Sequence, residues 1–186
     1  MLYKTIISAD DLKINLDNDD FLIFDSRCDI KDSGYGIDSY TEGHIPNSIF
    51  VDVDTDLASE KRPGTGRHPL PDPDRFSEKL SHWGMSNNKQ VVVYDDAGGA
   101  FAGRLWWMLK WLGHEAVAVL DGGLNSWVKG GNKLVTTPTV FEKAHFEPCV
   151  QENMIATVED VEEAQFKMNT ILLDARSKER YQGIND

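Results

Sequence analysis

The chain has 186 residues, of which 40% are hydrophobic, enough for one domain with an adequate core and a short appendage. Its 31 acidic and 19 basic side chains give a formal net charge of −12, which argues against nucleic acid or an anionic membrane as a partner, because both require basic patches. The sequence has no apolar run of signal-peptide or membrane-spanning length, and its two cysteines are too few for a disulfide framework, so we expect a cytoplasmic protein.

The first residues alternate between helical and strand patterns. Residues 8–19 predict a short helix, because Ser8 is a natural N-cap and two aspartates follow in the first turn. Residues 21–24 form a continuous apolar run, which is typical of a strand buried on both faces of a parallel sheet. We expect a polar loop over residues 29–39 and a second apolar strand at about residues 49–53.

Proline and glycine dominate residues 54–74, so we predict neither helix nor strand there. The segment is therefore expected to be a long surface loop. Ordered loops of this length are more often functional than short ones.

The next segments continue the alternation. The sequence predicts helices at residues 76–83 and 101–112 and a further helix that includes Trp127, with strands at residues 90–94 and 117–120. Strands that alternate with helices indicate an α/β fold with a central, mostly parallel sheet and helices on both faces. Residues 136–152 lack periodicity and contain two prolines, so we interpret them as an interdomain linker.

The end of the chain resembles its beginning. At an offset of 149 residues, Ser8 corresponds to Thr157, and the strand that ends in Asp25-Ser26-Arg27 corresponds to residues 170–176, which end in Asp174-Ala175-Arg176. Both copies read as a helix start followed by a buried strand. The sequence thus predicts one complete domain at residues 1–135 and, at residues 153–186, the truncated start of a similar second domain.

A tight turn at residues 95–100 joins a predicted parallel strand to a helix, which is where ligands bind in such folds. A cysteine there would have a lowered pKa, but the chain has Asp95 and Asp96, and a carboxylate at a helix start is more often a cap than a catalyst. Cys28 and Cys149 lie in other surroundings and read as bystanders. No His or Cys cluster has metal-ligand spacing, so we expect no metal and no cofactor.

Several motifs occur in an order that resembles the N-terminal half of a tandem-domain rhodanese. These are Asp25-Ser26-Arg27, Gly43-His44-Ile45-Pro46, the strand ending in Tyr94-Asp95, Arg104-Leu105-Trp106-Trp107 and Asp121-Gly122-Gly123. That family comprises the thiosulfate and 3-mercaptopyruvate sulfurtransferases. The resemblance implies a rhodanese-like fold and a double displacement, in which a loop thiolate takes a sulfane sulfur from a small anionic donor and passes it to cyanide or a thiol.

The resemblance also assigns roles to individual residues. In the family the second domain carries the catalytic cysteine, and the first domain has an acidic residue at the equivalent place, which Asp95 matches; the chain alone is then expected to be inactive. Arg180 matches a substrate-binding arginine, and Asp54 and His68 resemble an acidic residue and a histidine that face the active site in mercaptopyruvate-type enzymes. His44 and His114 are expected to be structural, and Arg27 to pair with Asp25 or Asp38.

Two alternatives remain open from the sequence. A non-catalytic rhodanese-like binding module of this length would show the same motifs. The apolar residues 171–173, with no sheet of their own, are expected to pack against the first domain or to pair with the same segment of a second chain, which would make a homodimer.

Overall fold

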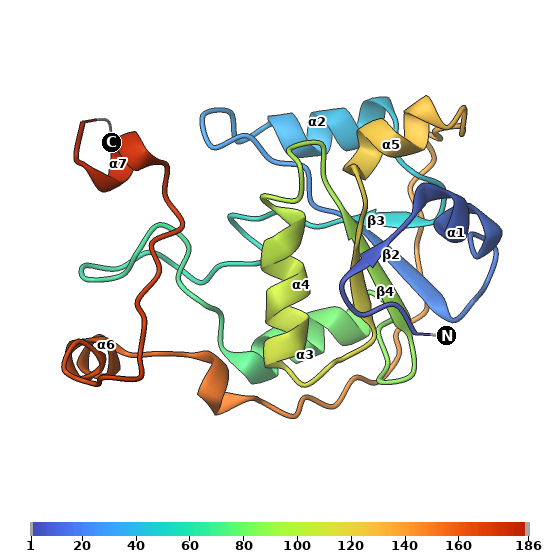
Figure 1. Cartoon of the computed structure of the whole chain (residues 1–186). Coiled ribbons are helices and arrows are strands. Elements are labelled where there is room, and N and C mark those ends of the chain that lie inside the picture. The colour runs from blue at the N-terminus through green and yellow to red at the C-terminus, as the bar shows by residue number, and fades with distance from the viewer. Residues whose placement is uncertain (1, 185–186) are drawn as a thin grey trace. The chain divides into compact units, whose positions relative to one another are not determined.

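The computed structural model describes residues 2–184 (Figure 1). The chain divides into two compact units, Met1–Gln151 and Glu152–Asp186. No helix within the described residues has the length and apolar character needed to cross a bilayer.

The larger unit is built on one sheet of five parallel strands in the order β1-β5-β4-β2-β3. The strands are β1 (Ile6–Ile7), β2 (Phe21–Asp25), β3 (Ser48–Phe50), β4 (Gln90–Tyr94) and β5 (Val117–Leu120). The predicted α/β fold with a parallel sheet is therefore confirmed. The apolar runs predicted as strands at residues 90–94 and 117–120 are β4 and β5.

Helices cover both faces of this sheet (Figure 1). They are α1 (Ala9–Ile14), α2 (Tyr35–Glu42), α3 (Pro73–His82), α4 (Ala102–Trp111) and α5 (Gly123–Lys129). Right-handed crossovers place α1 and α2 on one face and α3 and α4 on the other. The core on the α1 and α5 side packs Leu12 and Trp127 against Ile23, Val92 and Leu120 of the sheet.

Two elements of the larger unit lie outside the sequence-based predictions. β1 has only two residues, and Ile6 is 61% exposed, so no apolar run marks it. Helix α2 occupies part of the predicted loop at residues 29–39. Tertiary contacts hold it: a Cβ on Gly36 would lie 2.4 Å from the Arg27 carbonyl oxygen, and the Tyr40 hydroxyl donates to the Ser48 carbonyl at 2.8 Å.

The predicted long loop is present and ends at Asp72, the N-cap of α3. Its two sides approach each other, since the Ser59 N–H donates to the Pro69 carbonyl at 3.0 Å. Leu57 is fully buried, so one side of the loop is fixed to the core.

Residues 138–151, here called the strap, run in extended form along the larger unit. Backbone N–H groups of Ala144, Cys149 and Gln151 donate to the carbonyls of Ser81, Leu112 and Trp111 at 2.9, 2.9 and 2.7 Å. These carbonyls belong to the C-terminal ends of α3 and α4, where helices leave acceptors unsatisfied. The strap therefore completes the hydrogen bonding of two helix ends.

The smaller unit contains a 3₁₀ turn, η1 (Glu152–Met154), and the helices α6 (Val158–Ala164) and α7 (Lys178–Tyr181). Thr157 caps α6 by accepting from the Asp160 N–H at 3.2 Å, as Ser8 caps α1 by accepting from the Asp11 N–H at 3.1 Å. The helix start predicted at Thr157 is thus present.

The second shared feature of the two segments is the aspartate–arginine pair. Arg27 Nε lies 3.1 Å from Asp25 Oδ1, and Arg176 Nε lies 2.9 Å from Asp174 Oδ1. The first pair is buried, whereas the side chains of the second are 50% and 31% exposed.

The prediction of a strand at residues 171–173 is wrong, because no strand forms there. Ile171, Leu172 and Leu173 are 82%, 51% and 90% exposed. A strand requires a neighbour to accept its backbone hydrogen bonds, and the described residues of the smaller unit contain no other strand.

Candidate active site

The carboxyl ends of the parallel strands meet at one edge of the sheet. Arg27 and Cys28 follow β2, Asp54 follows β3, and Asp95 and Asp96 follow β4. In open parallel sheets this edge is where ligands bind. We take it as the candidate site.

Asp95 closes the turn between β4 and α4 and is 1% exposed. Its Oδ1 accepts from the N–H groups of Ala97 and Gly99 at 3.0 and 2.8 Å. Its Oδ2 accepts from Phe101 and Ala102 at 2.8 and 2.9 Å. Both carboxylate oxygens are thus used by the backbone, and the interpretation of Asp95 as a cap is confirmed.

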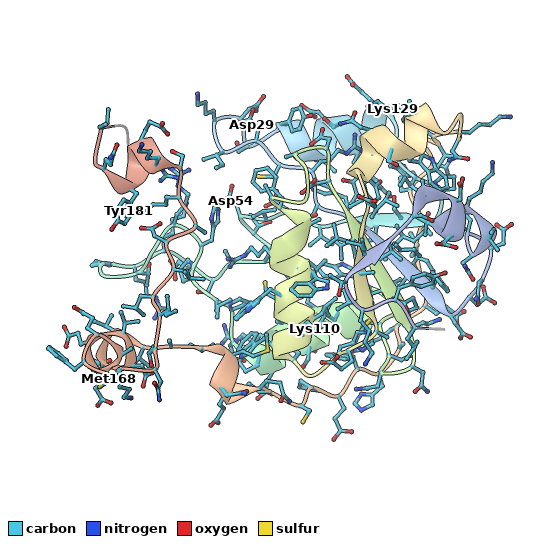
Figure 2. All side chains as sticks on the ribbon, viewed as in Figure 1. Asp29, Asp54, Lys110, Lys129, Met168 and Tyr181 are labelled. Atoms are coloured by element: carbon cyan, nitrogen blue, oxygen red, sulfur yellow. The ribbon has the colours of Figure 1, made fainter. Side chains whose placement is uncertain are left out.

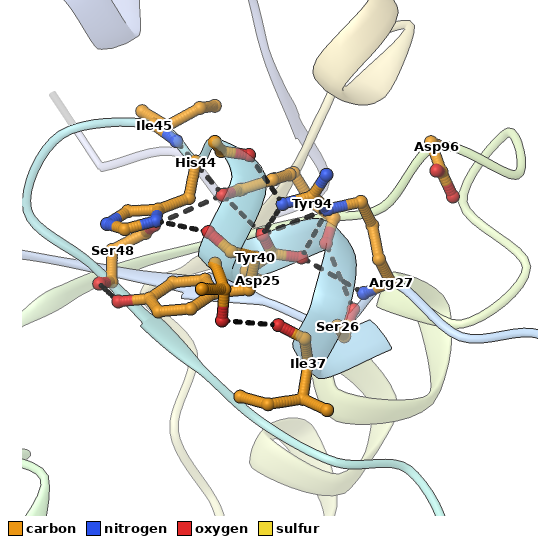
Figure 3. A network of polar contacts seen from close by, with 12 residues as sticks. Asp25, Ser26, Arg27, Ile37, Tyr40, His44, Ile45, Ser48, Tyr94 and Asp96 are labelled. Atoms are coloured by element: carbon orange, nitrogen blue, oxygen red, sulfur yellow. Dashed lines mark hydrogen bonds and ion pairs between the residues drawn. The ribbon is translucent and has the colours of Figure 1, made fainter. Parts of the chain in front are cut away.

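A buried polar network lies beneath this edge (Figure 3). Asp25 Oδ2 accepts from the Tyr94 hydroxyl and from Arg27 Nη2, both at 2.7 Å. Arg27 Nη2 also donates to the Gly43 carbonyl at 2.8 Å. Burial, with the Asp25 charge beside it, raises the pKa of Tyr94 well above its ordinary value. Arg27 therefore pairs with Asp25, as predicted, and the group is structural.

Both histidines expected to be structural are buried. His44 Nδ1 lies 2.7 Å from the Tyr40 carbonyl oxygen, and its ring stacks on the Tyr40 ring at 3.7 Å. Its Nε2 lies 3.1 Å from the Thr137 carbonyl oxygen. Burial lowers the pKa of His114.

Tyr35 on α2 donates a short hydrogen bond from its hydroxyl to Asp96. This bond, aided by burial, raises the pKa of Tyr35. The sequence does not reveal the contact, because its pattern predicts a loop around Tyr35. The pair leaves Asp96, unlike Asp95, partly open to solvent.

The structure brings Asp54 and His68 together. His68 Nε2 lies 2.8 Å from Asp54 Oδ1, across a loop that separates the two residues in sequence. Figure 2 labels Asp54. Asp54, His68, Cys28 and Arg67 are among the residues that line a cavity of about 220 Å³.

Cys28 lies half-buried beside this cavity. Burial raises the pKa of its thiol, and the negative charge of Asp54 raises it further. A raised pKa keeps the sulfur as the unreactive thiol. Cys149 is exposed on the strap. These surroundings support the interpretation of both cysteines as bystanders.

Arg180 lies on α7 of the smaller unit and is exposed. In the same unit, hydrogen bonds from Arg176 lower the pKa of Asp174 to about 2. The position of Arg180 is therefore described only relative to other residues of the smaller unit. Among residues 2–184, no group of three or more His, Cys, Asp or Glu side chains is arranged to hold a metal ion.

Comparison with known proteins decides the family. A family model described as rhodanese-like domain matches residues 8–130. The chain belongs to the rhodanese family. The motifs that resembled a rhodanese in sequence order are, in the structure, the strand ends and turns of its parallel sheet.

Curated relatives of this rhodanese carry sulfurtransferase names. It is 38% identical over 180 residues to a probable 3-mercaptopyruvate sulfurtransferase of Pseudomonas aeruginosa, covering 96% of this chain and 63% of the relative. It is 34% identical over 148 residues to rat thiosulfate sulfurtransferase, covering 77% of this chain and 48% of the relative. The chain therefore spans only about half to two thirds of the length of these relatives.

A solved structure agrees with this assignment. The crystal structure of SseA from Escherichia coli, a 3-mercaptopyruvate sulfurtransferase, matches with a TM-score of 0.83 and 28% sequence identity. The match covers 96% of this chain and 68% of that chain. The rhodanese fold is thus shown by sequence and by structure.

Proposed function

We propose that this chain is the N-terminal part of a two-domain sulfurtransferase. The parent protein would transfer sulfane sulfur from thiosulfate or 3-mercaptopyruvate to cyanide or a thiol. The observation that carries the proposal is that relatives named as sulfurtransferases match 96% and 77% of this chain and are longer than it. The shared cap and aspartate–arginine geometry of the two segments supports a second, similar domain.

The chemistry requires a thiolate that this chain does not present at the turn after β4. A cysteine sulfur would attack the sulfane sulfur, the bond from that sulfur to the donor would break, and a persulfide would form. The acceptor would then attack the outer sulfur and free the thiolate, which divides one transfer into two easier steps. Asp95 cannot form a persulfide, and its oxygens are already bonded to the backbone. The chain alone is therefore proposed to be inactive.

His68, Asp54 and Arg180 are proposed to serve the parent's active site. The Asp54 carboxylate orients the His68 imidazole, which can then exchange a proton with the donor or leaving group. The planar guanidinium of Arg180 suits a carboxylate or sulfonate-like donor. These roles rest on the family resemblance and on the Asp54–His68 contact.

The test compares this chain with a version extended by its downstream coding sequence. We expect thiocyanate formation from cyanide with one of the two donors in the extended protein only. His68→Asn and Asp54→Asn should each lower that activity, with Asp17→Asn as a remote control. A natural stop codon directly after Asp186, or full activity of the chain alone, would overturn the proposal.

A non-catalytic binding module remains the second candidate. The observation that favours it is the turn after β4, whose N–H groups are occupied by Asp95 rather than offered to a ligand. The same reading-frame experiment separates the two candidates. A cytoplasmic location is likewise a proposal, supported by the two free cysteines.

We also propose that two chains associate through Ile171, Leu172 and Leu173, because these exposed side chains form an apolar segment without a partner strand. Light scattering should give the mass of a dimer, and hydrogen exchange should show protected amides at residues 170–176. A monomer with unprotected amides there would contradict the association.

A further inference from the structure

Arg104, in the first turns of α4, is a half-buried cation without an anionic partner. Its Nε and Nη2 donate to the Leu57 carbonyl at 3.1 and 2.7 Å, and Nη2 also donates to the His68 carbonyl at 3.0 Å. No ion pair within residues 2–184 includes it. Burial lowers the pKa of its guanidinium, so the placement is costly and its contacts must offset the cost.

Those contacts join the two sides of the long loop at residues 54–72. Leu57 lies near the start of the loop and is fully buried, whereas His68 lies near its end. Between them Pro63 lacks a backbone N–H, and no helix or strand forms. One guanidinium therefore holds both sides at once.

The support for Arg104 is rigid. Asp95 Oδ2 accepts from the N–H groups of Phe101 and Ala102 and so fixes the start of α4. Arg104 lies in the same first turn of α4, and its guanidinium donates a hydrogen bond to the His68 carbonyl. The imidazole of the same residue then lies 2.8 Å from Asp54 Oδ1.

We propose that Arg104 is a positioning residue that holds His68 against Asp54 by bridging the carbonyls of Leu57 and His68. The importance of this for catalysis rests on the proposed role of His68. A guanidinium presents several donors in a planar fork, whereas an ammonium is a compact point charge. Arg104→Lys therefore keeps the charge and loses the bridge.

Nuclear magnetic resonance of His68 in this chain tests the proposal without any assay of sulfur transfer. In the unaltered chain, long-range proton–nitrogen spectra should show one His68 tautomer with a proton on Nε2 facing Asp54. In Arg104→Lys that signature should average toward a mixture of tautomers, as in Asp54→Asn. Amides of residues 57–68 should exchange about tenfold faster, as expected for the loss of one or two hydrogen bonds.

Arg62→Lys is the matched control. Arg62 belongs to the same loop, but it is exposed and its Nη2 lies 3.6 Å from Glu60 Oε2 instead of contacting His68. This variant should leave the His68 spectrum and the loop exchange unchanged. An unchanged His68 signature in folded Arg104→Lys, or the same change in Arg62→Lys, would refute the positioning role.

A measurement on the unaltered chain keeps the proposal testable if Arg104→Lys does not fold. Hydrogen bonds from both Nε and Nη2 should slow rotation about the Nε–Cζ bond of Arg104 and give separate signals for its two Nη nitrogens. A single averaged Nη signal would show that the bridge does not persist in solution. Because the readout is structural, failure of the chain to transfer sulfur would leave this result unaffected.

Discussion

Asp95 lies in the turn between β4 and α4, where the proposed sulfur transfer would need a nucleophile in an active domain, and its environment is that of a structural group. Four backbone N–H groups converge on its carboxylate inside the turn. A thiolate bound in this way would also be stabilised, because both are anions at a helix start. The same backbone arrangement therefore suits a cap in one sequence and a reactive sulfur in another.

Replacing Asp95 by alanine should destabilise the larger unit by on the order of 3 kcal/mol, because several N–H groups would lose a charged acceptor in a buried turn. Urea unfolding followed by tryptophan fluorescence measures this, since all five tryptophans lie in the larger unit. Asp96→Ala is the matched control and should cost about 1 kcal/mol, since Asp96 is partly exposed and loses one hydrogen bond, from Tyr35. Equal losses in both variants would contradict the structural role of Asp95.

The titration of Cys28 should report the carboxylates around it. In a Cys149→Ser background, alkylation by iodoacetamide should show a pH midpoint above that of a free cysteine, because burial and Asp54 raise the pKa of the thiol. Asp54→Asn removes a negative charge, which favours the thiolate, so the midpoint should fall and the rate at about pH 8 should rise. Asp17→Asn should change neither. A midpoint below that of free cysteine would mark Cys28 as an activated thiol.

At the scale of elements, the strap is as much a part of the larger unit as its helices. Its path passes directly over two glycines that end helices. A Cβ on Gly84 would lie 2.7 Å from Phe141 Cβ, and one on Gly113 would lie 2.6 Å from the Cys149 carbonyl oxygen. Both glycines have positive φ, 82° and 80°, and only glycine meets both requirements without strain.

A pair of glycine substitutions separates the strap contact from backbone strain. Gly131 has φ of 73°, and no atom lies within 4 Å of the point that a Cβ would occupy there, so Gly131→Ala should cost only about 1 kcal/mol. Gly113→Ala should cost about 2–4 kcal/mol, because it must also displace the strap. Denaturant unfolding measures the difference, and hydrogen exchange should show faster exchange at the Cys149 and Gln151 amides in Gly113→Ala alone. Identical losses would mean that the strap is not held there.

The elements that can be predicted from sequence are those whose signal is local. β4 and β5 are short apolar runs between breakers, and Ser8 and Thr157 are caps recognised from their own neighbours. Helix α2 escapes prediction because its stability comes from Gly36 and Tyr40 contacting distant backbone. The strand expected at residues 171–173 does not form although its local pattern is apolar, because the described residues of the smaller unit offer no second strand to pair with.

The residues of the candidate site also differ in how far the sequence predicts their contacts. Arg27 pairs with a residue two positions away, which spacing could suggest. The Asp54–His68 contact crosses a loop with no periodic pattern, so only the family resemblance pointed to it. Sequence reasoning assigns Arg104 no role of its own. Its signal in the sequence is a charge in the first turn of a mostly apolar helix, but the sequence does not identify the two carbonyls that it bridges.

At the scale of the whole molecule, the proposed absence of a nucleophile has a simple test. We expect the chain with both Cys28 and Cys149 replaced by serine to form thiocyanate at the same background rate as the unaltered chain, because burial and Asp54 raise the pKa of the Cys28 thiol and Cys149 lies exposed on the strap. The assay should use thiosulfate and 3-mercaptopyruvate separately. Strong activity that disappears with Cys28→Ser alone would place the active site after β2.

The strand order of the sheet affects how prone the chain is to aggregate while it is being synthesised. β1 pairs with β5, so Ile6 and Ile7 find Val119 and Leu120 only after most of the larger unit has been made. Without those few residues, β5 would present a bare edge to other nascent chains, and such edges template aggregation. The Trp106 indole N–H, which donates to the Lys4 carbonyl at 3.1 Å, helps to keep the segment in place. The short first strand therefore covers the edge of the sheet at β5. Deleting the N-terminal segment should lower the solubility of the protein before it changes any catalytic activity.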